Sequence, residues 1–275
     1  MKTAYENCLL ELLVKITGGR IMSFYKYLLN EEDRKQTYEI KDGRYISGHS
    51  IGIIAVDLKY PKLPGNVVNA TTFEYPVLYK KVEFEIEKLL KGDPEIETII
   101  INAAKDLEKD GVRAIIGACG FFANFQKSVA ESIDIPAYLS SLIQIPMIKT
   151  GLKTYQKVGV LTASVDNITE DTLRNVGASM DDCILRGIEF EEGFTPIRED
   201  LRNMDNRLMC DTVVKAAIEM VNEHPEIGAI LLECSDMPPY AHEIQKHLNL
   251  PVFDYITLIN WVNQAVVKKP YNGYF

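Results

Sequence analysis

Two cysteines occupy matching positions in two similar stretches of the chain. Cys119 and Cys234, 115 residues apart, each end an apolar run of the kind typical of a buried parallel strand. Beyond each cysteine the apolar positions continue to match at helical spacing, as far as Pro136 in the first stretch and Pro251 in the second. The sequence therefore predicts one structural unit that is used twice and that ends a strand with a thiol each time.

A thiol between a strand end and a helix start can act as an acid, a base or a nucleophile. The free N–H groups and partial positive charge of a helix N-terminus favour the thiolate, so we expect the pKa of both cysteines to be lowered. The same N–H groups can hold a carboxylate or a developing enolate. If one thiol lies on each face of a carbon atom, one can remove a proton while the other returns one, which inverts that carbon.

The alternative role for any single cysteine is inert core, because cysteine is among the most buried residue types. The equivalent positions of Cys119 and Cys234 favour a functional pair. Cys8 and Cys183 lie on apolar faces and are interpreted as core. Cys210 has no counterpart in the first stretch and is also interpreted as structural.

Alternating strands and helices are expected to position the two cysteines. Residues 50–57 and 157–164 are apolar runs that predict the first strand of each half, and helices are predicted over 76–90, 94–110 and 211–224. This alternation predicts parallel sheets with βαβ crossovers, which bind ligands at the carboxyl ends of their strands. The predicted fold class is α/β, with two pseudo-symmetric halves, each a parallel β-sheet flanked by helices, and an active site in the cleft between them.

The predicted domain organisation has an extension followed by the two halves. Residues 1–48 are expected to form an N-terminal extension of helices and a short hairpin that turns at Asp42. The first α/β half covers 49–150 and the second covers 155–250. A C-terminal helix within 254–275 is expected to pack on the first half.

Composition excludes several classes of function. The 275 residues carry a net charge of -9, which argues against a nucleic-acid partner. There is no apolar run of membrane-spanning length and no good signal peptide, so we expect a cytoplasmic protein without a membrane partner. The five cysteines form no metal-ligand cluster, and no phosphate-binding glycine motif follows a strand, so we expect neither a metal nor another cofactor.

Residues 50–263 resemble the aspartate/glutamate/hydantoin racemase superfamily. The resemblance rests on the strand at 50–57, the loop at 64–73, and the segments 117–122 and 232–240 around the two cysteines. It implies two pseudo-symmetric α/β halves with the active site between them, and a reaction without pyridoxal phosphate or metal. In that family the acid/base pair is one cysteine from each half, which here implies Cys119 and Cys234.

Two positions depart from the amino-acid racemases of that superfamily. Those racemases carry Cys-Asn-Thr at the first cysteine, whereas this chain carries Cys119-Gly120-Phe121, which offers no polar side chain to a carboxylate. The departure argues against aspartate and glutamate as substrates and leaves room for a larger, less polar or cyclic one such as a hydantoin. Glu233 stands where relatives often have glycine, and it either tunes Cys234 or makes a structural hydrogen bond.

The resemblance and the strand ends together give a set of candidate site residues. Ser235 holds the place of a threonine that binds the substrate carboxylate in the family, and Asp236 either orients Cys234 or caps a helix. Loop-stabilising roles are the common alternative for Asp57 and for the polar residues of the 64–73 loop. The predicted substrate-binding residues are Asp57, Asn69, Thr71, Thr72, Gly120, Phe121, Thr162, Ala163, Ser164 and Ser235, and the predicted modulating residues are Glu233 and Asp236.

The sequence therefore predicts a cofactor-independent racemase or epimerase, an isomerase that inverts a carbon next to a carboxylate or carbonyl. Two-base proton transfer between Cys119 and Cys234 would act on an amino acid or a hydantoin-like small molecule, in a protein expected to be a dimer. One alternative is an isomerase or decarboxylase of the same superfamily that needs a single cysteine. A small-molecule binding protein is the other, because fold alone does not decide function.

Overall fold

The computed structural model describes residues 33–39, 43–44 and 46–275, which fall into two compact units. One unit comprises 48–268, and the other comprises 1–47 together with 269–275. In the smaller unit, Asp33–Lys35 forms a short 3-10 helix, η1. The helices predicted before residue 30, the predicted turn residue Asp42 and Cys8 lie outside the described residues.

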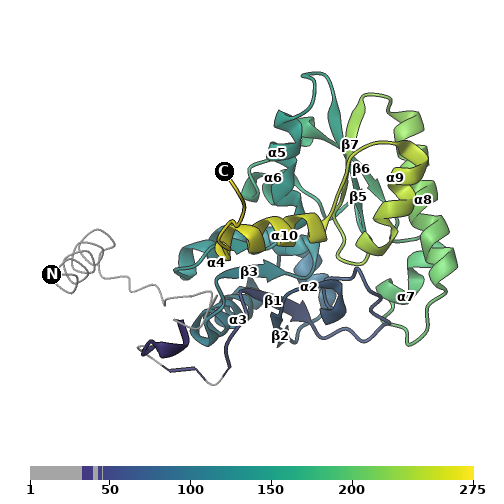
Figure 1. The fold of residues 1–275 in the computed structure, drawn as a ribbon. Helices are drawn as coiled ribbons and strands as arrows, with labels where there is room; N and C mark the ends of the chain where they lie inside the picture. The colour runs from purple at the N-terminus through teal and green to yellow at the C-terminus, as the bar shows by residue number, and fades with distance from the viewer. Residues whose placement is uncertain (1–32, 40–42, 45) are drawn as a thin grey trace. The chain divides into compact units, whose positions relative to one another are not determined.

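The larger unit contains two parallel four-stranded sheets (Figure 1). The strand orders are β2-β1-β3-β4 and β6-β5-β7-β8, so the second sheet repeats the order of the first. Every pairing is parallel. The predicted α/β fold with two similar halves is thereby confirmed. The strands are β1 Ile51–Val56, β2 Val77–Val82, β3 Ala114–Gly117, β4 Ala137–Tyr138, β5 Lys157–Thr162, β6 Cys183–Gly187, β7 Ile227–Leu232 and β8 Val252–Phe253.

Helices connect the strands and cover the sheets (Figure 1). The α-helices are α2 Ile86–Lys91, α3 Glu97–Asp110, α4 Gln126–Ser132, α5 Ile145–Thr150, α6 Glu170–Asn175, α7 Thr195–Arg198, α8 Asn206–Glu223, α9 Ala241–Leu248 and α10 Tyr255–Val266. The 3-10 helices of this unit are η2 Ala70–Thr72, η3 Pro94–Ile96, η4 Gly120–Phe125, η5 Ser141–Gln144, η6 Met180–Asp182, η7 Glu192–Phe194 and η8 Pro238–Tyr240. No helix among the described residues has the length and apolar character needed to cross a membrane.

The helix predicted over 76–90 is wrong, because Val77–Val82 forms edge strand β2 and only Ile86–Lys91 is helical. Strand β2 pairs with β1 alone, and most of its side chains are half-buried. An edge strand that mixes apolar residues with lysines lacks the continuous apolar run of a central strand, so its periodicity is easily taken for that of a helix.

Local sequence explains where the longer elements begin and end. Asp93 caps the turn before α3 by accepting the N–H of Glu95 at 2.9 Å, and Gly111 ends α3 with a left-handed φ of 93°. Asp205 caps α8 through the N–H groups of Arg207 and Leu208. These caps fix the crossover helices that deliver β3 and β7, the strands that lead to the two cysteines.

The C-terminal helix α10 packs against the first sheet. Its buried residues Tyr255, Leu258, Ile259 and Val262 lie in one apolar cluster with residues of β1 and β3. Asp254 caps the helix by accepting the N–H of Thr257 at 2.8 Å. This packing buries Tyr255 completely, close enough to the end of β3 to interact electrostatically with the first cysteine.

Candidate active site

The two cysteines lie at the carboxyl ends of corresponding strands. Cys119 lies between β3 and η4, and Cys234 lies between β7 and the loop that leads to η8. The N–H of Phe121 donates to the Cys119 thiol, and the N–H of Asp236 donates to the Cys234 thiol, so each sulfur accepts from the residue two positions later. The repeated unit that the sequence predicts thus includes the local geometry of the thiols.

Hydrogen bonds between the two halves hold the two strand ends together. The Ser235 hydroxyl donates to the carbonyl of Ala118 at 2.9 Å, and the N–H of Val67 donates to the carbonyl of Ser235 at 3.4 Å. From the first half, the Ser141 hydroxyl donates to the carbonyl of Glu233 at 3.1 Å. The neighbours of each cysteine are therefore bonded to the opposite half. Ser235 is predicted to bind a carboxylate, but its hydroxyl group donates to a backbone carbonyl in this structure.

The prediction that the helix starts lower the pKa of the two thiols is wrong. Burial raises the pKa of Cys119, and the negative charge of Glu233 raises it further. Burial also raises the pKa of Cys234, followed by the charges of Asp236 and Glu233. The N–H hydrogen bonds lower both values by less. Desolvation and neighbouring carboxylates outweigh the dipoles of two short 3-10 turns, so the free site holds thiols and not thiolates.

Asp236 is the hydrogen-bond partner of the Cys234 thiol. The Cys234 Sγ donates to Asp236 Oδ2 at 3.5 Å, and the Tyr60 hydroxyl donates to the same oxygen at 2.8 Å. The Asn66 side-chain amide donates to the other oxygen, Oδ1. Burial raises the pKa of the Asp236 carboxyl, and these hydrogen bonds lower it by less. The arrangement positions a carboxylate to accept the proton of the Cys234 thiol.

The sequence interpretation missed Tyr60 and Asn66. Both lie between β1 and β2, but Tyr60 precedes the 64–73 loop on which the resemblance rests, whereas Asn66 belongs to it. In that loop the sequence predicts Asn69, Thr71 and Thr72 as the polar site residues. The sequence signal for Asn66 is the Pro-Gly-Asn turn, which places this residue near the start of the 64–73 loop.

Glu233 places a second carboxyl group between the two halves. Its side chain is 0% exposed, and its Oε2 accepts from the Thr162 hydroxyl at 2.9 Å and from the N–H of Ala163 at 3.3 Å. Its Oε1 has no hydrogen-bond partner. A Cβ atom on Gly120 would lie 1.6 Å from that oxygen, so the absent side chain of Gly120 leaves the space that this carboxyl fills beside Cys119.

Burial raises the pKa of Glu233 from its usual 4.5 to about 7, although the hydrogen bonds from Thr162 and Ala163 lower it. The folded state therefore binds this proton more tightly than the unfolded chain does. The contribution of Glu233 to stability is complete below about pH 4.5 and falls as the pH rises to about 7, by a total of about 3 kcal/mol.

We expect Glu233→Gln to lack this fall in stability. Urea unfolding of both proteins between pH 4.5 and pH 8 measures it, and the free energy of unfolding of the variant should gain about 3 kcal/mol relative to wild type across that range. Subtracting the two curves cancels the other carboxyl groups. Curves that run parallel would mean that the pKa of Glu233 is not raised.

The remaining candidate residues make hydrogen bonds and ion pairs away from the thiols. The Asp57 carboxylate pairs with Lys81 at 3.3 Å and with Lys59 at 3.7 Å. Asn69 caps η2 by accepting the N–H of Thr71 at 2.9 Å. These contacts stabilise the loop and the strand end around them, and leave a substrate-binding role for these residues as a prediction.

The side chains of three further candidates are already engaged or packed. The Thr72 hydroxyl accepts the N–H of Gly65 at 2.9 Å. The Ser164 hydroxyl is buried and accepts from Asn167 at 2.9 Å. The Phe121 ring is 1% exposed and belongs to the core. Its backbone N–H, and not its ring, serves the site.

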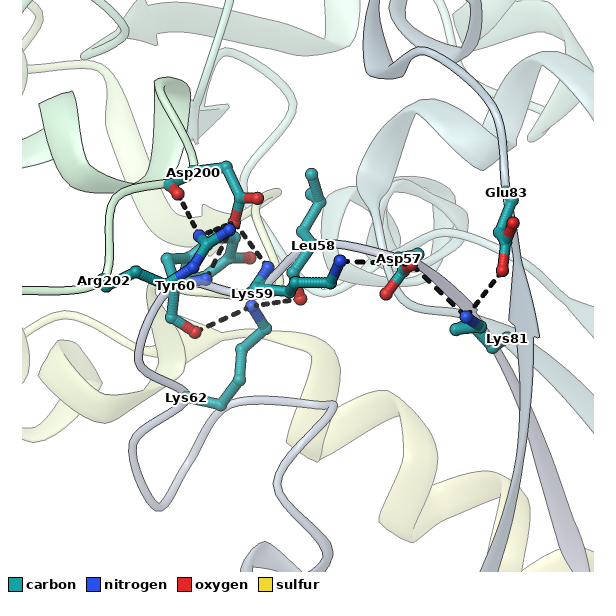
Figure 2. A network of polar contacts seen from close by, with 9 residues as sticks. All are labelled: Asp57, Leu58, Lys59, Tyr60, Lys62, Lys81, Glu83, Asp200 and Arg202. Atoms are coloured by element: carbon teal, nitrogen blue, oxygen red, sulfur yellow. Dashed lines mark hydrogen bonds and ion pairs between the residues drawn. The ribbon is translucent and has the colours of Figure 1, made fainter.

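The loop 57–65 after β1 is held by the second half of the chain (Figure 2). Asp200 Oδ1 accepts the N–H of Lys59 at 2.5 Å and the N–H of Tyr60 at 2.8 Å, and Arg202 forms an ion pair with the same carboxylate at 3.2 Å. Asp200 has a left-handed φ of 50°. Because Tyr60 holds Asp236, this contact between loops supports the partner of Cys234. Asp200 was not anticipated from the sequence.

Lys62 is a cation that faces this network (Figure 2). Its Nζ donates to the carbonyl of Leu58 at 3.3 Å and to that of Tyr60 at 3.1 Å, and lies 2.9 Å from the centroid of the Tyr60 ring. Burial lowers its pKa to about 8, and the charge of Asp236 opposes that shift. Lys62 thus stiffens the loop that carries Tyr60.

We expect Asp200→Ala to lower the free energy of unfolding by about 1–3 kcal/mol, because two backbone N–H groups lose a charged acceptor. Urea unfolding measures the change. Asp171→Ala is the matched control, since it removes an exposed aspartate whose ion pair with Arg174 is worth little. Equal effects of the two substitutions would argue against a structural contact between the loops.

Two hollows share Met204, and the inner one is lined by Asp236. The inner cavity, lined by Asp236 and Asn66, has a volume of about 10 Å³ and has room for one water molecule. The outer cleft, of about 580 Å³, lies along residues 192–208. No cluster of three or more metal-ligating side chains occurs among the described residues.

Comparison with known proteins decides the family. No family model matches the chain. The chain is 32% identical over 233 residues to a dimethylsulfoniopropionate lyase from Durusdinium sp. clade D, across 82% of this chain and 77% of that protein. This chain belongs to the dimethylsulfoniopropionate lyase family. It is also 30% identical over 236 residues to dimethylsulfoniopropionate lyase 7 of Emiliania huxleyi (strain CCMP1516), across 82% of this chain and 69% of that protein.

Solved structures place this lyase-family chain in a wider fold family. Unliganded arylmalonate decarboxylase matches with a TM-score of 0.51 at 16% identity, across 82% of this chain and 96% of that one. Allantoin racemase from Pseudomonas fluorescens matches with a TM-score of 0.53 at 17% identity, across 79% and 91%. The chain therefore shares the fold of these two enzymes, which confirms the predicted resemblance at the level of the fold.

The predicted activity is wrong, although the predicted fold is right. Relatives at about 30% identity are named as lyases, which overturns the prediction of a racemase, and of an isomerase in general. Of the predicted alternatives, the single-cysteine decarboxylase fits these lyase relatives better than the racemase does. A small-molecule substrate is consistent with these relatives, whereas the expected dimer and the expected cytoplasmic location stay predictions.

Proposed function

We propose that this protein is a lyase that cleaves dimethylsulfoniopropionate or a closely related sulfonium carboxylate. The observation that carries the proposal is the hydrogen bond from the Cys234 thiol to the buried Asp236, at the end of β7 in a chain of the dimethylsulfoniopropionate lyase family. A thiol with a carboxylate as proton acceptor is a base suited to removing a proton next to a carboxylate group.

The proposed reaction is an elimination. A base removes a proton from the carbon next to the substrate carboxylate, and the electrons of that C–H bond form a double bond to the next carbon. The bond from that next carbon to sulfur breaks, and its electron pair leaves with dimethyl sulfide, so that the other product is acrylate. The sulfide leaves from a cation as a neutral molecule and needs no proton, so one base is sufficient.

The side chains around Cys234 suit the role of that single base. Asp236 accepts the proton of the Cys234 thiol, and the resulting thiolate accepts the proton from the substrate. The hydrogen bonds from Tyr60 and Asn66 fix Asp236 in position to do so. After the products leave, one proton passes from the Cys234–Asp236 pair to solvent. The overall reaction therefore releases one proton for each sulfonium cleaved. Cys119 contacts the substrate in this scheme and transfers no proton.

The remaining candidate residues keep their proposed places around the substrate. Three of them act through the carboxyl group of Glu233. Gly120 leaves the space for this group, and Thr162 and Ala163 donate hydrogen bonds to it. Ser164 and Ser235 support the strand ends of the second half. Residues of the loop after β1 shape the entrance to the site.

The test is incubation of the purified full chain with dimethylsulfoniopropionate, with dimethyl sulfide measured by headspace gas chromatography and acrylate by NMR. We expect the two products in equal amounts, and none from heat-inactivated protein. A phenyl-substituted malonate and an amino acid run in the same panel as comparison substrates. The absence of sulfide from this and related sulfonium carboxylates, while another compound is consumed, would overturn the proposal.

A further inference from the structure

We propose that Glu233 recognises the positive charge of the substrate, and thereby makes the site selective for cations over neutral molecules of the same shape. The inference rests on the proposed function, because it concerns the sulfonium group of the substrate. It assigns to Glu233 a task separate from that of Cys234 and Asp236, namely to decide which molecules bind and not to move protons.

The position of the Glu233 carboxyl group supports this role. It extends from the end of β7, next to Cys234, into the space that the missing side chain of Gly120 leaves next to Cys119. The carboxyl group is therefore shared by the two strand ends that carry the thiols. Thr162 and Ala163 fix one of its oxygens, so its direction does not depend on the substrate.

The absence of a hydrogen-bond partner for one oxygen of Glu233 indicates that this oxygen interacts with a ligand. Oε1 is buried and accepts no hydrogen bond, whereas nearly all buried polar atoms in proteins have a partner. A sulfonium group carries no N–H or O–H to donate, so the interaction that it offers is charge. A buried carboxylate oxygen without a donor is matched to such a cation, because a tightly hydrogen-bonded oxygen would have to give up its donors first.

The charges around Glu233 leave it without a counter-ion. Among the described residues, the titratable groups that interact with it are Cys119, Cys234, Asp236 and Tyr255, each of which is neutral or negative. The cation of Lys62 acts on Asp236 and binds backbone carbonyl groups in its own loop. A bound cation would therefore supply the charge that balances the Glu233 carboxylate.

Asp236 is less suited to this task than Glu233. Tyr60 and the Cys234 thiol donate to one of its oxygens, and Asn66 donates to the other. Charge recognition by Glu233 also assists the chemistry. Its negative charge is one cause of the raised pKa of both thiols, and a cation beside it offsets that effect. The Cys234 thiol then ionises more easily when the substrate is present.

Binding of two molecules that differ only in charge tests the proposal. The cationic probe is 3-(trimethylammonio)propionate, and the neutral-headed probe is 4,4-dimethylpentanoate, in which carbon replaces the charged nitrogen. We expect calorimetric titration of the full chain at pH 8 to give at least about 10-fold tighter binding of the cationic probe. Glu233→Gln should bring the ratio of the two dissociation constants close to one, with the value for the neutral-headed probe little changed.

Two controls accompany the titrations. Glu226→Gln makes the same substitution near the other end of β7, at a side chain that faces His224, and should keep the wild-type ratio. The pH dependence of wild type requires no variant and covers the case that Glu233→Gln does not fold. Because the pKa of Glu233 is about 7, the preference for the cationic probe should rise between pH 6 and pH 8.

Each other outcome overturns the proposal. Equal binding of the two probes by wild type, or a preference that survives in a folded Glu233→Gln variant, would show that Glu233 does not recognise charge. Such a result leaves the lyase proposal intact if sulfide is still formed. If wild type binds neither probe and forms no sulfide, the proposed function and the charge recognition both fail.

Discussion

Replacement of Cys234 by serine is expected to lower the rate of sulfide formation by about 1,000-fold. The hydroxyl group of serine ionises far less readily than a thiol, so the variant lacks the base that removes the substrate proton in the proposed scheme. General acid–base groups typically contribute between about 100-fold and 10,000-fold to a rate. Headspace measurement of dimethyl sulfide at saturating substrate gives kcat, and urea unfolding checks that the variant retains its stability.

Cys119→Ser is the matched control, because Cys119 occupies the corresponding position in the first half. Its hydroxyl group still accepts the N–H of Phe121, and in the proposed scheme the residue contacts the substrate without transferring a proton. We expect a loss of about 10-fold. Equal losses in the two variants would contradict a single-base elimination and would require a proton transfer at each strand end.

The sequence was sufficient to predict the fold because the evidence for it is local. The apolar runs at 50–57 and 157–164 become β1 and β5, and each of the two cysteines lies two residues after the end of its strand, β3 or β7. A buried central strand must be apolar along its whole length, which makes it visible without knowledge of its neighbours. Strand β2 lies at an edge, where half-exposed side chains give no such pattern.

The site was predicted less completely because its contacts join distant parts of the chain. Tyr60 and Asn66 reach Asp236 across 176 and 170 positions, and Asp200 reaches the N–H of Tyr60 across 140. The pKa of each thiol depends on burial by residues of both halves, so the direction predicted from the helix starts alone was wrong. Inversion and elimination both begin with removal of a proton, and they differ in the leaving group, which belongs to the substrate and not to the fold.

Glu233 and Gly120 were predicted in part, because the sequence shows both residues but not the contact between them. Both departures from the racemase pattern were visible in the sequence, as a glycine after the first cysteine and a glutamate before the second. That they compensate for each other in space became visible only in the structure, where the carboxyl group of one fills the space left by the other. Two departures that lie 113 positions apart in the sequence thus form one feature of the site.

Asp236→Asn is expected to lower kcat/KM by about 100-fold at pH 7, with a deficit that shrinks as the pH rises. In the proposed scheme the carboxylate of wild type accepts the thiol proton, so activity requires only that Asp236 be ionised. Its pKa is raised above the usual 3.8, and activity should increase with pH as it ionises. Asparagine cannot accept the proton, so the variant must release the Cys234 proton to solvent and becomes active only as the thiol itself ionises.

Loss of the Asp236 charge also changes the thiol, in the opposite sense. The carboxylate is one cause of the raised pKa of Cys234, so its removal lowers that pKa and makes the thiolate accessible at alkaline pH. Profiles of kcat/KM from pH 6 to pH 10 measure both effects. Tyr60→Phe is the control, because it keeps the proton acceptor and removes one hydrogen bond that lowers the pKa of Asp236. Its activity should fall about 10-fold and should rise at a higher pH than that of wild type, but still with the ionisation of Asp236 and not with that of the thiol. A deficit in Asp236→Asn that stayed constant from pH 6 to pH 10 would mean that Asp236 positions Cys234 but does not accept its proton.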